Sequence, residues 1–226
     1  MKSAITFLAF FSIVCLSACT GLFDTGGPIS IEPGQGTHNT YDHLDSNNNV
    51  IDPSSPDNPR VKIRTNYGDM VVELYENKAP VTVQNFLRYV DAGFYDKTIM
   101  HRVRKDFMIQ GGGFAYNGVK KDSRDPIANE ASNGLKNKKY TVAMARTGDP
   151  NSAAAQFYIN HNDNMALDFR GFSPDAFGYC VFGSVIEGRD TVDRIAHVKC
   201  KNSSYLPKEK SEPVKIVKIL SIRRVK

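Results

Sequence analysis

One short stretch, MHRVRKDFMIQGGGF, concentrates the side chains that could act on a substrate. It contains an imidazole (His101), a guanidinium (Arg102) and a neutral amide (Gln110), together with the apolar pair Phe107 and Met108. An imidazole can transfer protons near neutral pH, and a guanidinium donates several hydrogen bonds while keeping its charge. The glycines that follow allow another backbone to approach closely. This stretch is therefore the first candidate site.

Two common kinds of site do not fit the stretch. A phosphate-binding loop requires Gly-Lys-Ser/Thr at the start of a helix, and neither feature follows these glycines. A serine hydrolase requires a nucleophile at a sharp turn and an ordered acidic partner for its histidine, and neither can be named for His101. A lone histidine beside a strand is more often a structural hydrogen-bonding residue than a base. The candidate functional groups of this stretch are therefore the cation Arg102, the neutral amide Gln110 and the apolar pair Phe107 and Met108.

The elements that position this stretch are predicted to begin at residue 60. Apolar and charged residues alternate over 60–65, a turn follows, and residues 70–75 form a second strand, so a β-hairpin is expected. A helix is expected next, because Pro80 suits its first turn and Gly93 suits its C-terminal cap.

The rest of the chain predicts a barrel. Short apolar runs separated by Gly, Asn and Asp occupy residues 98–188, which is typical of an all-β sandwich or barrel. A short helix is expected over 191–196 and a last strand over 214–219. Without an internal repeat or a second domain, the sequence indicates one mainly β domain with two helices.

The N-terminus has the features of an export signal. A positive start precedes an apolar run over residues 4–16, which is shorter than the ~20 residues that a bilayer span requires. The following Leu-Ser-Ala-Cys resembles a bacterial lipoprotein signal, which implies that Cys19 is acylated and anchors the protein to a membrane. Thr20 in place of Asp favours the outer membrane, with the domain facing the periplasm. Plain secretion with cleavage near Ala18 is the alternative.

Charge divides the mature chain into two parts. Residues 20–59 hold six acids and no Lys or Arg, whereas residues 60–226 hold 28 basic and 18 acidic residues. We therefore expect a signal over 1–18, an extended acidic tether over 19–59 and a folded domain over 60–226. His38 and His43 lack partners at metal-ligand spacing. The spread of basic residues favours a solvated surface over a nucleic-acid site, since no stacking motif accompanies it.

Several motifs together resemble cyclophilin-type peptidyl-prolyl isomerases over residues 60–226. The stretch from His101 to Phe114 resembles the family signature, and five further motifs occur in the family's order: APVTVQNF (79–86), NEASNGL (129–135), VAMART (142–147), AQFYIN (155–160) and FGYCVFG (177–183). The resemblance implies an eight-stranded antiparallel barrel capped by two helices. It also implies an isomerase of Xaa–Pro bonds that needs no cofactor or metal and binds proline-containing chains, such as exported or unfolded ones.

The resemblance implies a role for each site residue. Arg102 is the donor to the prolyl nitrogen and stabilises the rotating carbonyl, and Gln110 binds a substrate carbonyl. Gln156 supports Arg102 or the substrate. Backbone groups at Ala145 and Arg146 pair with the peptide as a short strand does. The proline pocket consists of Phe107, Met108, Tyr158 and Leu167, whereas Phe157 faces the core because neighbouring strand residues point to opposite faces.

The chain departs from the family pattern at four places. Ala166 stands where the family has an aromatic residue at the rim, which puts inhibition by cyclosporin in doubt. Tyr158 replaces a Phe and adds a hydroxyl that needs a partner. Tyr179 matches the position of the family's late His. The turn Arg104-Lys105-Asp106 replaces an apolar-Pro-Gly turn.

The remaining expectations concern the cysteines and the protein's class. Cys180 lies in an apolar run and is expected to be a buried, reduced thiol, although an oxidising compartment permits a bond to Cys200. We expect a monomer. The rival to an enzyme is a non-catalytic proline-peptide binding module or chaperone. Retention of Arg102 and Gln110 favours the enzyme, because a pure binder does not require a donor at the rotating bond.

Overall fold

The alternating sequence at the start of the domain forms the expected hairpin. In the computed structural model, which describes residues 55–225, β1 (Arg60–Thr65) pairs antiparallel with β2 (Gly68–Leu74). Val61 and Ile63 are fully buried, whereas the charged residues between and beside them reach solvent. One face of the hairpin therefore covers the core, as the pattern predicted.

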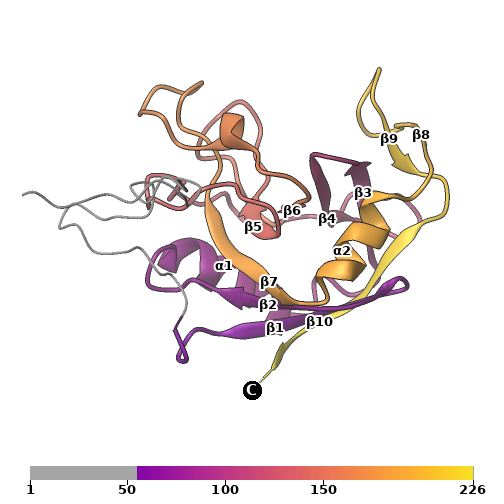
Figure 1. Ribbon diagram of the computed structural model, residues 1–226, viewed down its shortest axis with the longest axis horizontal. Helices are drawn as coiled ribbons and strands as arrows, with labels where there is room; N and C mark the ends of the chain where they lie inside the picture. The colour runs from indigo at the N-terminus through magenta and orange to yellow at the C-terminus, as the bar shows by residue number, and fades with distance from the viewer. Residues whose placement is uncertain (1–54, 226) are drawn as a thin grey trace, which may run out of the picture. The chain divides into compact units, whose positions relative to one another are not determined.

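Eight strands close into an antiparallel barrel in the order β1-β10-β3-β4-β6-β5-β7-β2 (Figure 1). The other strands of the barrel are β3 (Thr98–Arg104), β4 (Met108–Ala115), β5 (Thr141–Met144), β6 (Phe157–Asn160), β7 (Val181–Glu187) and β10 (Val217–Val225). The predicted eight-stranded barrel is confirmed. Closure pairs both edges of every strand, so the barrel has no free edge.

Two α-helices pack against the barrel in the described part of the chain, α1 (Pro80–Asp91) and α2 (Arg189–Ala196). Phe86 of α1 contributes a ring to the core, with ring centroids 5.2 Å from Tyr95, 5.5 Å from Phe157 and 5.2 Å from Phe182. The start of α1 is capped from outside the helix, because the Glu130 carboxylate accepts hydrogen bonds from the backbone N–H groups of Val81 and Thr82. Such a cap satisfies donors that a helix leaves unpaired.

The region after α2 differs from the prediction. A two-stranded sheet of β8 (Cys200–Asn202) and β9 (Lys210–Pro213), here called the β8–β9 hairpin, precedes the last strand. The expected strand over 214–219 is wrong in its bounds, because β10 begins only at Val217. The side chains of Val214 and Ile216 imitate a strand pattern, but they are 51% and 44% exposed in the turn between β9 and β10.

Two residues just before β1 contact the barrel domain. The backbone carbonyl of Pro59 accepts a hydrogen bond from Leu74 N at 2.9 Å, and Asn58 is buried. Pro59, which the sequence assigned to the tether, therefore pairs with β2. The expectations for Cys19, His38 and His43 fall outside the described residues. Among residues 55–225, no helix is both long and apolar enough to cross a membrane.

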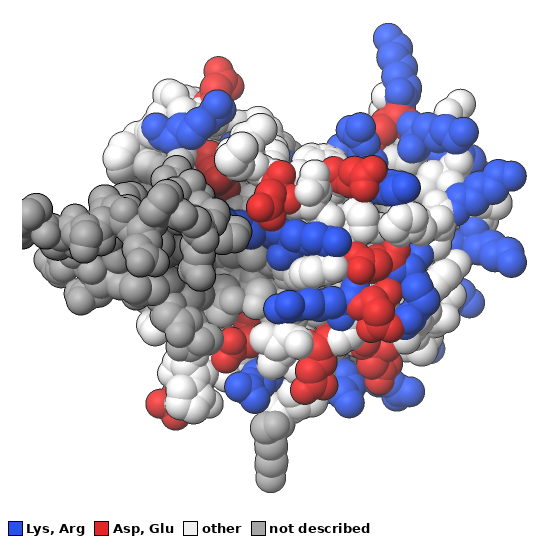
Figure 2. Space-filling view, viewed as in Figure 1, with Lys and Arg blue, Asp and Glu red and all other residues white. Residues whose placement is uncertain are grey.

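Charged residues of both signs share the surface. On the face in Figure 2, Lys and Arg side chains are interspersed with Asp and Glu side chains. Oppositely charged side chains of the domain also form close pairs, such as Arg223 with Asp96 at 2.6 Å and Arg224 with Asp91 at 2.7 Å. The positive charge of the domain therefore does not form one continuous patch on this face.

Candidate active site

A small apolar cluster lies apart from the main core, with its buried members on β4, β5, β6 and the start of β7. It buries Met108, Ala143, Tyr158 and Val181, and a ring of half-buried side chains surrounds it: Phe107, Leu135, Ala145, Leu167 and Tyr179. The four residues expected to form a proline pocket are thus brought together. Phe157 lies in the main core instead, as its position on the strand indicated.

The hydroxyl of Tyr158 has a partner inside the protein. It donates to Asn137 Oδ1 at 2.7 Å, and Asn137 is itself buried. Burial raises the pKa of the Tyr158 phenol well above its ordinary value, so the hydroxyl stays neutral. The ring therefore packs in the apolar cluster while its hydroxyl is satisfied by a buried partner.

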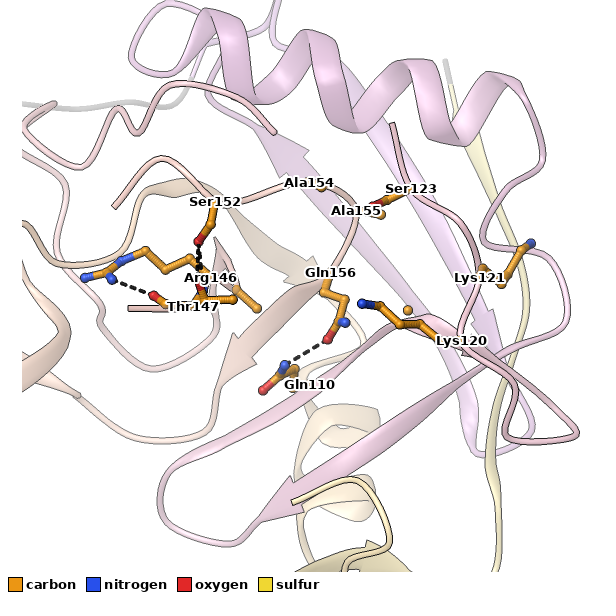
Figure 3. Close-up of a pocket in the computed structure, with 12 residues that line it drawn as sticks. Gln110, Lys120, Lys121, Ser123, Arg146, Thr147, Ser152, Ala154, Ala155 and Gln156 are labelled. Atoms are coloured by element: carbon orange, nitrogen blue, oxygen red, sulfur yellow. Dashed lines mark hydrogen bonds between the residues drawn. The ribbon is translucent and has the colours of Figure 1, made fainter. Parts of the chain in front are cut away.

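Three polar side chains form a chain of hydrogen bonds beside this apolar cluster. Arg102 and Gln110 are opposite each other on β3 and β4, and Arg102 Nη1 donates to Gln110 Oε1 at 3.2 Å. Gln110 Nε2 then donates to Gln156 Oε1 at 3.1 Å, as Figure 3 shows. Gln156 therefore reaches Arg102 through Gln110 rather than directly.

A glycine makes room for this chain. A Cβ atom added at Gly113 would lie 2.5 Å from Gln156 Nε2 and 2.6 Å from its Cδ and Cγ atoms. Any larger residue at this position would displace the Gln156 side chain. This glycine of the signature thus has a steric role in the site.

One backbone hydrogen-bonding group of Ala145, its N–H, is already used within the barrel. Its N–H donates to the carbonyl of Gln156 at 3.0 Å, because Ala145 extends the ladder between β5 and β6. This N–H is therefore not one of the groups that could pair with a peptide, which corrects part of the expectation for Ala145 and Arg146. The Arg146 side chain donates to Gly178 O at 2.9 Å and lies 4.5 Å from the centroid of the Tyr179 ring.

A cavity of about 240 Å³ adjoins the amides of Gln110 and Gln156. Figure 3 shows these two side chains facing each other, with Lys120 on one side and Arg146, Thr147 and Ser152 on the other. Sequence reasoning did not assign Lys120, Thr147 or Ser152 to the site. The run of charged residues after Asn117-Gly118, which begins with Lys120 and Lys121, is the sequence signal that could have indicated Lys120.

His101 is not placed to act as a base. It is buried against the rings of Phe114 and Tyr205, with centroids 4.6 and 5.4 Å away. Burial, reinforced by the charge of Arg102, lowers the pKa of His101 to about 4, so its ring is neutral at physiological pH. Its Nδ1 atom has no hydrogen-bond partner among the described residues, so the expected structural hydrogen bond is not made through that atom.

Two of the places where the sequence departs from the family pattern, Ala166 and the turn at residues 104–106, lie next to residues of the apolar cluster. Ala166 is exposed in the short 3-10 helix Met165–Leu167, directly before the half-buried Leu167. Asp106 has a left-handed backbone with φ 59°, and its N–H donates to His161 Nδ1 at 3.0 Å. The charged turn thus adopts a conformation that glycine would adopt more easily.

A further residue that the sequence did not indicate lies beside Arg102. Glu209, directly before β9, lies with its carboxylate 2.7 Å from Arg102 Nε and 3.0 Å from Arg102 Nη2. The two residues are 107 positions apart, and no sequence motif links them. Arg102 also lies over the ring of Phe107, with 5.8 Å from its Cζ atom to the ring centroid. The guanidinium therefore stands between the apolar cluster and an acidic partner.

Residues 55–225 contain no group of three or more His, Cys, Asp or Glu side chains arranged to hold a metal ion. Both described cysteines carry free thiols. Cys180 is buried beside Thr82, and burial raises the pKa of its thiol to about 12. Its expected burial is confirmed, while its redox state in the cell stays a prediction.

The domain combines a closed eight-stranded antiparallel barrel and two helices with an apolar cluster on one side and an arginine beside that cluster. The sequence profile described as "Cyclophilin type peptidyl-prolyl cis-trans isomerase/CLD" matches residues 60–224. The chain therefore belongs to the cyclophilin family and is a peptidyl-prolyl cis-trans isomerase.

Relatives of known activity agree with this assignment. The chain is 54% identical to peptidyl-prolyl cis-trans isomerase cyp18 of Streptomyces antibioticus, over 63% of this chain and 86% of that protein. It is 51% identical to peptidyl-prolyl cis-trans isomerase B of Escherichia coli K12, over 66% and 93% of the two chains. A crystal structure of a Cryptosporidium parvum cyclophilin with the dipeptide Ala-Pro has a TM-score of 0.61, at 27% identity over 74% of this chain and 99% of that one.

Proposed function

We propose that this isomerase acts on Xaa–Pro bonds of exported polypeptides at the bacterial cell envelope and so assists their folding. The observation that supports the site is the position of Arg102, half-buried beside Phe107 at the edge of the apolar cluster. A proline ring seated in that cluster would bring its nitrogen next to the guanidinium.

The chemistry requires no nucleophile. The prolyl amide resists rotation because its nitrogen lone pair is shared with the carbonyl, and a peptide bond has a barrier of ~18–20 kcal/mol. A hydrogen bond from Arg102 to that nitrogen draws the lone pair out of conjugation and favours the twisted transition state. Each ~1.4 kcal/mol of such selective stabilisation accelerates rotation about tenfold.

The remaining residues hold the substrate while one side of the bond turns. Phe107, Met108, Tyr158 and Leu167 hold the proline ring. Gln110 uses one amide N–H on Gln156, and its second N–H is the group that we assign to a substrate carbonyl. The backbone at Arg146 guides the peptide past the site.

The location is proposed from the N-terminus. The apolar run followed by Leu-Ser-Ala-Cys supports export and acylation of Cys19, with the domain facing the periplasm. Several acyl chains on one cysteine would give stable anchoring, whereas one chain binds only marginally. The six acids of residues 20–59 and the absence of Lys and Arg there support a solvated tether.

Three measurements test the proposal. A protease-coupled assay on a proline peptide should show turnover by the purified full chain, and membrane fractionation should find the wild-type protein with membranes and Cys19→Ser in the soluble fraction or unprocessed. Peptide binding without acceleration would indicate the non-catalytic module instead. An unmodified N-terminus on the mature wild-type protein, found by mass spectrometry, would exclude the lipid anchor.

A further inference from the structure

The β8–β9 hairpin contacts three consecutive residues of β3, the strand that carries Arg102. Tyr205 packs on His101, with ring centroids 5.4 Å apart, and also on Phe114 of β4 at 4.4 Å. Cys200 Sγ lies 3.6 Å from the carbonyl of Val103. Glu209 binds Arg102 between these two contacts. The hairpin is thus fixed on the strand independently of the ion pair.

The ion pair itself is bidentate and partly shielded. The Glu209 carboxylate binds the edge of the guanidinium formed by Nε and Nη2, at 2.7 and 3.0 Å. The side chains of Arg102 and Glu209 are only 21% and 24% exposed. A two-point contact fixes the plane of a guanidinium, which a single contact does not.

The pair leaves part of the guanidinium available. Of its five N–H donors, two bind Glu209 and one binds Gln110. One N–H on Nη1 and one on Nη2 are left for a substrate. Glu209 therefore occupies the edge of Arg102 that borders the hairpin and does not take every donor.

We propose that Glu209 is a positioning residue, which holds the guanidinium of Arg102 at the angle required to meet a prolyl nitrogen. The β8–β9 hairpin thereby becomes part of the active site. This inference rests on the role proposed for Arg102. A flexible arginine samples many rotamers, and restraining it before the substrate arrives lowers the entropy lost in the transition state.

The alternative is that Glu209 blocks the arginine. A carboxylate that competed with the substrate would have to leave before turnover, and its removal would accelerate the reaction. The two unengaged N–H groups and the fixed hairpin argue for positioning. The two roles predict opposite signs for the effect of one substitution.

The test is kinetics of Glu209→Ala in the full chain. We expect kcat to fall about tenfold while KM changes less than about twofold, because an interaction that matters in the transition state is reflected in kcat. Glu209→Gln keeps the size and one acceptor, so we expect a smaller loss of about threefold. The matched control is Glu212→Ala, which removes the partner of Lys201 and Ser204 within the same hairpin but has no contact with Arg102.

A double-mutant cycle separates positioning from simple structural damage. In an Arg102→Ala background, Glu209→Ala should cause no further loss, because the residue acts only through the arginine. Equal losses in both backgrounds, an equal loss for Glu212→Ala, or a faster Glu209→Ala enzyme would overturn the inference.

If Arg102→Ala alone abolishes most turnover while Glu209→Ala and Glu209→Gln have no effect, the proposed function stands and this inference fails. Near-normal turnover of a folded Arg102→Ala variant would overturn both.

Discussion

The hydroxyl of Tyr158, a residue of the apolar cluster, donates a 2.7 Å hydrogen bond to Asn137 Oδ1, and Asn160 Nδ2 lies 3.3 Å from the same oxygen. Removing the hydroxyl therefore leaves that acceptor with a partner. We predict that Tyr158→Phe retains kcat/KM within about threefold, because the ring still packs, and loses about 1 kcal/mol of stability. Thermal unfolding and the isomerase assay measure the two effects. A large loss of turnover without a loss of stability would assign the hydroxyl a catalytic role.

Substitution of Gly113 should lower the isomerase activity more than the stability of the fold. A Cβ there would displace Gln156, whose flexible side chain can move aside at small cost, but the movement breaks the 3.1 Å bond to Gln110. Gly113→Ala should lower kcat/KM by about fivefold with a change in unfolding free energy below about 1 kcal/mol. The control is Gly148→Ala, since nothing lies within 4 Å of a Cβ at that position. Unchanged kcat/KM in Gly113→Ala would show that the position of Gln156 is immaterial.

His101 should make the domain less stable in acid. Its pKa is lowered to about 4 in the folded protein, while an unfolded histidine titrates near its ordinary value of 6.5. Between these pH values the unfolded chain binds the extra proton, so stability falls as pH falls, by up to about 1.4 kcal/mol per pH unit. Denaturant unfolding at pH values from 7 to 4 measures this effect. We expect the free energy of unfolding to fall less steeply with decreasing pH in His101→Gln than in the wild type. The control is His197→Gln, at an exposed position. If the pH dependence of the unfolding free energy is the same in His101→Gln as in the wild type, the buried neutral ring is contradicted.

The rim residue Ala166 should weaken inhibition by cyclosporin. An aromatic residue there would contribute about 2–3 kcal/mol of apolar contact, which corresponds to roughly 30- to 150-fold in affinity. We therefore predict weak inhibition of the wild type, and a gain in inhibitor affinity for Ala166→Trp that exceeds any change in kcat/KM. Met165→Trp places the same ring one residue away and should give less. Tight inhibition of the wild type without a gain in Ala166→Trp would show that Ala166 is not at the inhibitor's rim.

The barrel could be predicted because its signals are local. The alternation in β1, the proline at the start of α1 and the short apolar runs each depend on a few neighbouring residues. The strand expected at Val214 and Ile216 was wrong for the same reason, since local alternation does not reveal that both side chains face solvent. The β8–β9 hairpin carries little apolar alternation, so it gave no strand signal.

The site was predictable only as far as its motifs extend. Phe107, Met108 and Tyr158 lie in motifs that resemble the family, and the fold brings them together with Leu167. The contacts of Tyr158 with Asn137 and of Arg102 with Glu209 connect segments distant in sequence, and they depend on how loops pack after the barrel closes. Nor could the sequence show that the Ala145 N–H is used within the ladder, because that depends on strand register.

The most direct test of the account is kcat/KM of Arg102→Ala and Arg102→Lys against Arg104→Ala. Arg104 is a matched control, because its guanidinium also lies over Phe107, 5.5 Å from the ring centroid, but it has an exposed position on the same strand. We predict a loss of at least ~100-fold for Arg102→Ala, about 2.7 kcal/mol, with little rescue by lysine, which lacks the forked donors. Arg104→Ala should stay within about threefold of the wild type. An Arg102→Ala variant with a native thermal transition and near-normal turnover would contradict the account.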